Sequence, residues 1–247
     1  AILLGILALA CLAIIVIGLR AVLRSTSKPL AQQNKIITRT TVAFILWVCV
    51  IAALSISGAL SQFHSFPPRP MLIVFIPIGI AVVLLFTKGF TNILRATPAH
   101  WLVLFQSFRI VVELLLWQAY EHQLIPVQMT FEGRNFDMAA GLLALAAGWA
   151  MWLHPQWARP VGFLFNLIGL ALLINIMAVA VLSLPTPMRY FTDGIDSANV
   201  TTFPFIYLPA TLVVLAFAFH LFSLRQLALQ KKERPVSVSA ANSTIAV

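Results

Sequence analysis

Seven long apolar stretches, separated by short polar connections, restrict the folds open to this sequence. They comprise residues 2–23, 41–60, 71–86, 101–120, 138–153, 161–184 and 205–224. A helix of about 20 apolar residues crosses the hydrocarbon core of a bilayer. Lipid offers the backbone no hydrogen-bond partners, so a segment within it must be a helix or part of a closed barrel. The pattern therefore predicts an all-α, polytopic transmembrane bundle of about seven helices.

The composition agrees with a single membrane domain. Hydrophobic residues make up 61% of the chain and charged residues 9%, with a mean hydropathy of +0.97, whereas soluble domains are about half apolar and a quarter charged. This balance excludes a water-soluble fold. We assign residues 1–234 to the seven-helix domain, and the small polar residues of 235–247 predict a disordered cytoplasmic tail.

Charges alternate between successive connections, which predicts the orientation. Short cytoplasmic loops carry the excess of Lys and Arg, so we place the N-terminus outside, the C-terminus in the cytoplasm and the chain in the inner (plasma) membrane as a multi-pass protein. The net charge of +9 comes from residues that flank apolar stretches, so we expect the lipid bilayer, and not nucleic acid, as partner. The predicted inner connections hold twelve basic residues: Arg20, Arg24, Lys28, Lys35, Arg39, Lys88, Arg95, Arg159, Arg225, Lys231, Lys232 and Arg234. The outer connections hold Arg69, Arg134 and Arg189 with five acidic residues, Glu121, Glu132, Asp137, Asp193 and Asp196.

Ionisable residues inside apolar stretches are costly and are candidates for function. Gln106, Arg109 and Glu113 share one face of the fourth stretch, and Arg109 and Glu113 have the i, i+4 spacing of an ion pair. His220 and Ser223 share a face of the last stretch at a similar depth. We expect these five residues to form a cluster that either locks helix packing or lines a ligand or proton pathway, with His220 suited to carry a proton.

The connection before the fifth stretch holds Glu132, Arg134, Asn135 and Asp137 within six residues. A structural interpretation is that Asn135 or Asp137 caps the next helix, Gly133 adopts a positive φ and Glu132 pairs with Arg134. A functional interpretation is a folded lid that presents Glu132, Arg134 and Asp137 to a solute.

Other polar residues within the apolar stretches are fewer. Asn166 and Asn175 project to nearly opposite faces of their helix, so at most one is expected to join the cluster, and Asn166 shares its face with Gly162 and Gly169. His100 and His154 are not spaced as zinc ligands. We predict neither a metal site nor another cofactor.

Three motifs resemble an uncharacterised family of bacterial multi-pass inner-membrane proteins. They are F-R-x-x-V-E at 108–113, T-F-E-G-R-N-F-D at 130–137 and H-x-x-S-L-R-Q-L at 220–227. The resemblance implies a prokaryotic inner membrane and attaches no activity.

Three functions follow from the residues. The first is binding or transport of a small polar or anionic solute, with Arg109 as charge partner, Glu113 as counter-charge or proton site and His220 as a coupled proton group. The second is a membrane-embedded enzyme that uses the same groups as acid and base on a lipid or quinone-like substrate. The third is a non-catalytic accessory subunit that binds a partner subunit in the membrane.

Overall fold

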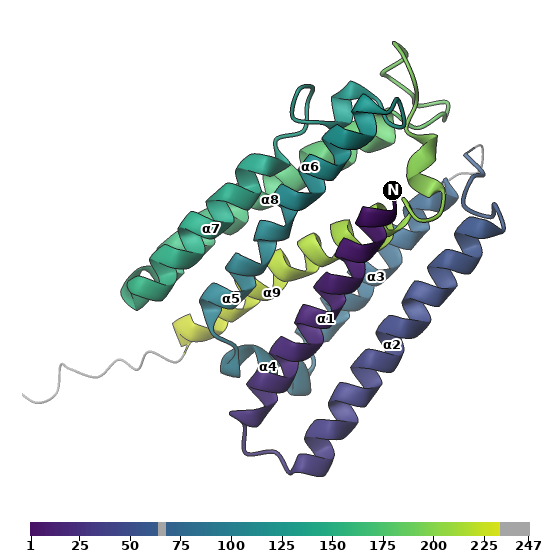
Figure 1. Ribbon diagram of the computed structural model, residues 1–247. Coiled ribbons are helices and arrows are strands. Elements are labelled where there is room, and N and C mark those ends of the chain that lie inside the picture. Colours follow the sequence, from purple (N-terminus) through teal and green to yellow (C-terminus); the bar gives the residue numbers. More distant parts are fainter. Residues whose placement is uncertain (64–67, 233–247) are drawn as a thin grey trace, which may run out of the picture.

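The computed structural model describes residues 1–63 and 68–232, and within them every regular element is a helix (Figure 1). The all-α prediction is confirmed for these residues, whereas the predicted tail, 235–247, lies outside them. The helices are α1 Ile2–Arg24, α2 Leu30–Ile56, α3 Arg69–Leu85, α4 Lys88–Ala96, α5 Ala99–Leu104, α6 Phe108–Glu121, α7 Asp137–Leu153, α8 Ala158–Leu182 and α9 Val214–Lys232.

Short helical turns of other types lengthen three of these helices. The 3-10 turn Phe105–Ser107 joins α5 to α6, and a second 3-10 turn, Pro155–Trp157, leads into α8. The π-helical segment Leu208–Val213 leads into α9. Because no break separates the segments, Ala99–Glu121, Pro155–Leu182 and Leu208–Gln230 each form one continuous helical stretch.

Five helical stretches of the described chain are long and apolar enough to cross a membrane: Ile2–Arg24, Leu30–Ile56, Ala99–Glu121, Pro155–Leu182 and Leu208–Gln230. α3 and α4 pass the same test together, but the helix axis bends by 83° between them. α7 is apolar and has 17 residues, which corresponds to about 25 Å of helix.

The ends of the helices differ from the predicted ends, because hydropathy marks the apolar part of a helix and not its full length. α2 starts at Leu30 instead of at residue 41, since its first three turns are polar, and it ends at Ile56, two residues before Gly58 at φ 73°. The separate helix α4 was not predicted. The last helical stretch starts at Leu208 and continues to Lys232, beyond the predicted range 205–224.

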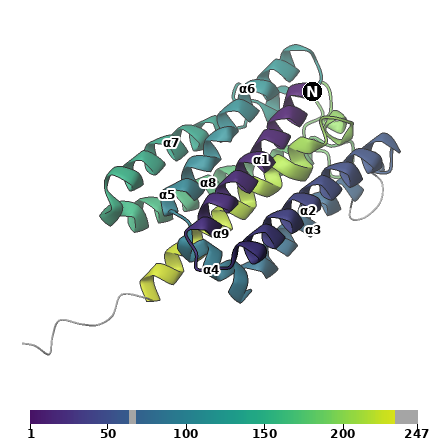
Figure 2. The ribbon, with the colours of Figure 1, turned by 60° about the horizontal axis from the view of Figure 1, so that its bottom comes forward.

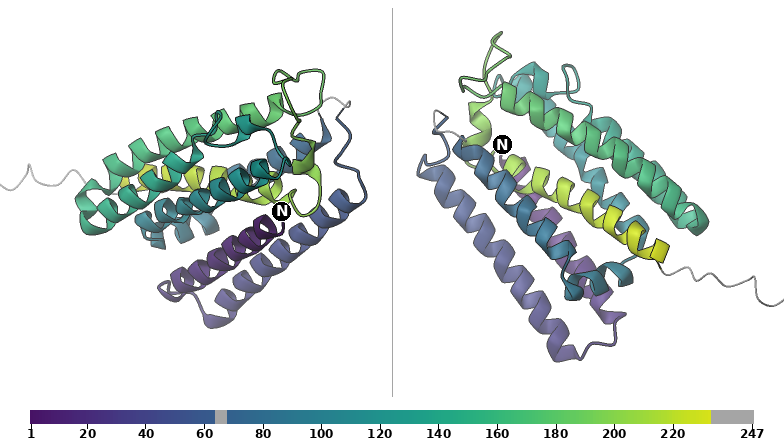
Figure 3. Two further views of the ribbon diagram at one scale, coloured as in Figure 1. Left: turned by 45° about the horizontal axis from the view of Figure 1, so that its top comes forward. Right: turned by 180° about the vertical axis from the view of Figure 1, so that it is seen from behind.

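α9 occupies the centre of the bundle. It packs against α3, α4, α5 and α8, and from behind it lies between α3 and α8 (Figure 3). α1 and α2 form an antiparallel pair on one side, and α6, α7 and α8 lie on the other (Figures 1 and 2). In the most apolar part of the stretch Leu208–Gln230, which contains most of α9, 56% of the residues are buried, whereas only 6% are buried in the corresponding part of α2. Polar residues of α9 are therefore placed inside the protein.

The bundle has two distinct ends. The end of α2, the start of α3 and the connections α6–α7 and α8–α9 lie together with residue 1 at one end, which we call the loop end (Figure 1). α9 finishes at the opposite end, which we call the tail end.

Two glycines of α7 allow it to approach α5 and α6 closely. A Cβ atom at Gly141 would lie 2.5 Å from Ile110 Cγ1, and one at Gly148 would lie 2.4 Å from Leu104 Cγ. Small residues at helix interfaces permit such contact in membranes. The close packing brings the start of α7 against α6, where Arg109 lies.

Candidate functional site

A chain of buried polar side chains runs between α6, α7, α8 and α9. Each of its members is at most 6% exposed. Buried polar groups are costly unless they are hydrogen-bonded, so the partners of each one indicate how the site is held. The members, which we call the polar network, are Glu113, Asn135, Asp137, Arg109, His220, Asn166 and Ser223.

Arg109 of α6 forms a two-pronged ion pair with Asp137, the first residue of α7. Its Nε donates to Oδ2 at 3.1 Å, and its Nη2 donates to Oδ1. Bidentate pairs of this kind are among the strongest hydrogen-bonded contacts in proteins. Asp137 also lies in the first turn of its helix, where the helix dipole favours a negative charge. The ion pair fastens α7 to α6.

The predicted ion pair between Arg109 and Glu113 is wrong. Glu113 instead accepts a hydrogen bond from Asn135 Nδ2. Its carboxylate also lies close to the backbone N–H of Phe131, and Oε1 makes no hydrogen bond of normal geometry to any described residue. Arg109 pairs with Asp137 instead, because Asp137 lies on a facing helix and presents both carboxylate oxygens to the guanidinium at once.

His220 of α9 continues the network from the other side of Arg109. Arg109 Nη1 lies 3.2 Å from His220 Nε2 and donates to the carbonyl of Gly169 in α8 at 3.3 Å. Since arginine has donors only, Nε2 is the acceptor and the proton of the neutral ring is on Nδ1. Nδ1 then donates to Asn166 Oδ1 at 2.8 Å. Arg109 thereby joins four helices.

Asn166 carries the network on to the tail end. Its Nδ2 donates to Ser223 Oγ at 2.8 Å and to the carbonyl of Gly162 at 2.6 Å. Asn175, on the same helix, instead donates to the backbone carbonyl of Arg134 at 2.7 Å. As expected, one of the two asparagines joins the cluster.

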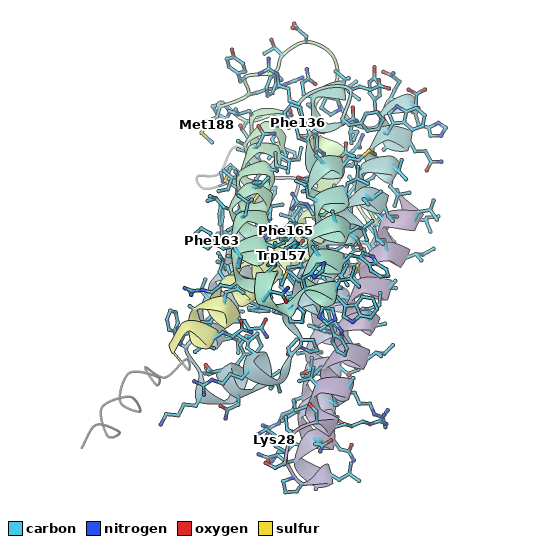
Figure 4. All side chains as sticks on the ribbon, turned by 90° about the vertical axis from the view of Figure 1, so that its left-hand side faces the viewer. Lys28, Phe136, Trp157, Phe163, Phe165 and Met188 are labelled. Atoms are coloured by element: carbon cyan, nitrogen blue, oxygen red, sulfur yellow. The ribbon has the colours of Figure 1, made fainter. Side chains whose placement is uncertain are left out.

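Gly169 makes room for the histidine ring. A Cβ atom there would lie 2.3 Å from His220 Cε1, closer than any side chain allows. Phe165, buried on the same helix, packs against the ring with a centroid distance of 5.3 Å. Its neighbour Phe163 is exposed, and both are labelled in Figure 4. The shared face of Asn166 and Gly169 was the sequence signal for this contact, but it also fits simple close packing.

Gln106 does not join the network. It is fully buried, and its amide nitrogen, Nε2, donates to the backbone carbonyl of Ala216 in α9 at 2.9 Å. Its Oε1 has no hydrogen-bond partner in the described part of the chain. Of the five expected cluster residues, Arg109 and His220 are in direct contact, Ser223 is connected through Asn166, and Glu113 through Asn135 and Asp137.

The connection between α6 and α7 is folded tightly onto the bundle. Asn135 is its central residue: Nδ2 donates to Glu113 and to the carbonyl of Met129 at 3.0 Å, and Oδ1 accepts from the backbone N–H of Asp137 at 3.0 Å. The predicted cap of α7 by Asn135 or Asp137 is wrong: the N-cap is Phe136, whose side chain makes no capping bond, and Asn135 stands one residue earlier. The Asn135 side chain links the Glu113 carboxylate to the backbone N–H of Asp137, a role that no local motif indicated.

The other charged residues of this connection face away from the network. Glu132 is exposed and accepts a hydrogen bond from Trp117 Nε1 at 2.8 Å, while the Arg134 guanidinium lies over the Phe191 ring at 5.2 Å. Neither contact is the predicted pairing of Glu132 with Arg134.

Gly133 does not have the predicted positive φ. Glycine is needed there for space instead, because a Cβ atom would lie 2.2 Å from the carbonyl oxygen of Val127. The connection is therefore folded back on itself at this point.

A cavity of about 110 Å³ lies beside the polar network towards the loop end. α3, α6, α8 and the π-helical start of α9 form its walls, which are apolar, and Asp137 and Asn135 are its polar lining side chains. Lining residues such as Phe75 and Val181 are exposed or partly exposed, so the cavity opens at the side of the bundle between α3 and α8. Its remaining lining residues include Met71, Val112, Leu116, Met129, Ile176, Met177 and Val213.

Within residues 1–63 and 68–232, no group of three or more His, Cys, Asp or Glu side chains is arranged to hold a metal ion. The network is instead a hydrogen-bonded assembly of side chains.

Fold and site together define an all-α protein with several helices fit to cross a membrane and a buried ion-pair network beside a lateral cavity. The model of the family described as Domain of unknown function (DUF8737) matches residues 67–228, more than half of the 247 residues. The chain belongs to this family, which confirms the prediction of an uncharacterised one. The match includes the whole polar network and leaves α1 and α2 outside. No curated protein and no solved structure matches the chain.

Proposed function

We propose that the chain is a multi-pass protein of a bacterial inner (plasma) membrane, with seven spans, an external N-terminus and a cytoplasmic C-terminus. The bent pair α3–α4 and the short helix α7 would complete the five long stretches to seven spans. The loop end would then face outward, because its connections carry three basic residues against the twelve of the opposite connections and the tail.

Labelling of single cysteines in intact cells tests this orientation. In a background with Cys11→Ala and Cys49→Ala, Thr192→Cys at the loop end should react with a membrane-impermeant maleimide. Ser27→Cys, between α1 and α2, should react only after the cells are permeabilised. Both positions are exposed, so the opposite labelling pattern would contradict the orientation.

We further propose that the protein binds a lipid-like molecule that enters the cavity sideways from the bilayer. The observation that carries this proposal is the lateral opening of an apolar cavity onto two buried polar side chains, Asp137 and Asn135. Ligand sites are typically apolar with a few placed polar groups, and a side entrance between α3 and α8 suits a ligand that is already dissolved in the membrane.

An anionic solute is supported less well by the same geometry. The charge of Arg109 is balanced by Asp137, and its Nε, Nη1 and Nη2 groups all donate to protein acceptors. Arg109 is 1% exposed and does not line the cavity. An incoming anion would have to reach an enclosed guanidinium whose charge Asp137 already balances.

Native mass spectrometry of protein purified in a mild detergent tests lipid binding. Val181→Trp places a large ring at the cavity, whereas Ile174→Trp makes the same kind of change at an exposed position of α8 that does not line it. We expect a co-purified lipid with the wild type and with Ile174→Trp, and its loss with Val181→Trp. Equal occupancy in both variants would refute the proposal.

A second candidate function, proton-coupled transport of a small polar solute, is favoured by the continuity of the network. Side-chain hydrogen bonds connect Ser223 through Asn166, His220 and Arg109 to Asp137. Asn135 then joins the backbone N–H of Asp137 to the Glu113 carboxylate. Buried carboxyl and histidine groups form proton relays in pumps and transporters. Proton uptake into liposomes that depends on a solute, and that Glu113→Gln abolishes, would support it, while uptake unchanged in this variant would contradict it.

A further inference from the structure

The hydrogen-bonding groups at the cavity wall restrict the chemistry of its ligand. Asp137 and Asn135 are the polar side chains among its lining residues in the described chain. Their existing hydrogen bonds leave some of their atoms free and occupy others. The free atoms therefore decide which head group can bind.

Asn135 has no N–H left to offer. Its two Nδ2 protons are taken by Glu113 and by the carbonyl of Met129, and its Oδ1 accepts one hydrogen bond from the backbone of Asp137. An amide oxygen has two lone pairs, so Oδ1 can accept one further hydrogen bond. Asn135 can therefore accept a hydrogen bond from a ligand but cannot donate one.

Asp137 is also an acceptor. Each of its oxygens receives one hydrogen bond from Arg109, and an ionised carboxylate has about four lone-pair sites in all. The polar part of the wall consequently offers acceptors, and a ligand there must bring its own hydrogen-bond donor.

The charges next to the cavity favour an uncharged donor. Arg109 neutralises Asp137 in a pair whose side chains are 2% and 9% exposed. An ammonium group there would compete with Arg109 for the Asp137 carboxylate and would place a second cation in a largely apolar cavity, which is costly. A hydroxyl group satisfies the acceptors without adding charge.

The size of the cavity limits how much of the ligand it encloses. Its volume of about 110 Å³ is smaller than the roughly 150 Å³ apolar cavity that holds one benzene molecule. It can therefore enclose a head group and its first few carbons, and the rest of an alkyl chain would lie at the opening between α3 and α8.

We propose that the cavity binds the hydroxyl head of an uncharged, single-chain membrane amphiphile, which donates a hydrogen bond to the Asp137 carboxylate. The inference rests on the proposed lipid-binding function and adds the head-group chemistry. It also assigns Asp137 a second role, as ligand acceptor in addition to partner of Arg109.

Amphiphiles that share a decyl chain test the inference on the full chain in detergent. The probes are 1-decanol, decyl methyl ether, decylammonium and decanoate, and affinities come from thermal-shift titrations. Val181→Trp provides the background from non-specific partitioning, and Ile174→Trp is the matched control. Asp137 is left unchanged, because its loss would remove the ion pair.

We expect decanol to bind about ten- to a hundredfold more tightly than the ether, which lacks the donor, as for the loss of one hydrogen bond to a charged group. This difference should persist in Ile174→Trp and disappear in Val181→Trp. Decanoate should bind more weakly than decanol, because its carboxylate would face Asp137.

The other outcomes separate the two proposals. Specific binding of the ether, decanoate or decylammonium at least as tight as that of decanol would overturn the hydroxyl inference and leave lipid binding intact. Binding of every probe to the same extent in wild type and Val181→Trp would overturn both.

Discussion

The ion pair between Arg109 and Asp137 makes the sharpest energetic prediction about this protein. We consider Arg109→Met, Asp137→Asn and the double variant, with the free energy of unfolding measured in mixed micelles. Either single change leaves one charge buried without its partner, since Arg109 is 1% and Asp137 6% exposed. Loss of one partner of a buried pair costs about 3–5 kcal/mol.

The double variant should recover much of this loss. It removes both charges, so the stability lost should be clearly less than the sum of the two single losses. Two unit charges 4 Å apart interact by about 4 kcal/mol at an effective dielectric constant of 20, and we expect a coupling energy of about 3 kcal/mol. Neutral hydrogen bonds between membrane helices average about 0.6 kcal/mol in such cycles. A coupling energy near that lower value would refute the reasoning.

A second cycle distinguishes the observed partner from the one that local spacing suggests. Glu113 is four residues from Arg109 on the same helix but is hydrogen-bonded to Asn135. The cycle of Arg109→Met with Glu113→Gln should therefore give a coupling energy at least about 1 kcal/mol smaller than the cycle with Asp137. Equal or larger coupling to Glu113 would show that the pairing described above is wrong.

Three further variants and one control test how the bundle is packed. Gly169→Ala should lower the free energy of unfolding by about 1–3 kcal/mol through a clash with the histidine ring, whereas Gly79→Ala, with open space at its Cβ position, should be neutral or stabilising. Trp47→Phe should cost about 0.5–1.5 kcal/mol, because the Trp47 Nε1 hydrogen bond to the Ala210 carbonyl, 3.1 Å long, is lost; an unchanged unfolding midpoint would contradict this. Gly133→Ala should speed limited proteolysis between α6 and α7, since its Cβ would overlap the Val127 carbonyl, and unchanged protection would argue against the tight fold of this connection.

The helices could be predicted from the sequence because the signal for each one is local. A long apolar run indicates a helix by itself, and the i, i+3, i+7 spacing of Gln106, Arg109 and Glu113 correctly indicated that all three side chains are buried. The polar start of α2 and the helix α4 beyond the bend were missed, because their residues are too polar to belong to an apolar run.

The partners within the site could not be predicted in this way. Arg109 pairs with a residue 28 positions further along the chain, and the pairing depends on how the intervening connection folds. That fold is fixed by the multiple hydrogen bonds of Asn135 and by the close approach at Gly133. The i, i+4 spacing of Arg109 and Glu113 suggested that these two residues pair, because spacing along one helix contains no information about such tertiary contacts.

The two candidate functions share residues and are therefore energetically linked. Asp137 and Asn135 line the cavity and belong to the polar network at the same time. A ligand hydroxyl on Asp137 would share that carboxylate with Arg109, whose Nη1 contacts His220, and Asn135 connects the same place to Glu113. Coupling between two sites is reciprocal, so any ligand that changes proton binding at Glu113 must bind with an affinity that depends on that proton. A cavity occupant and a proton in the network would each act as an effector of the other.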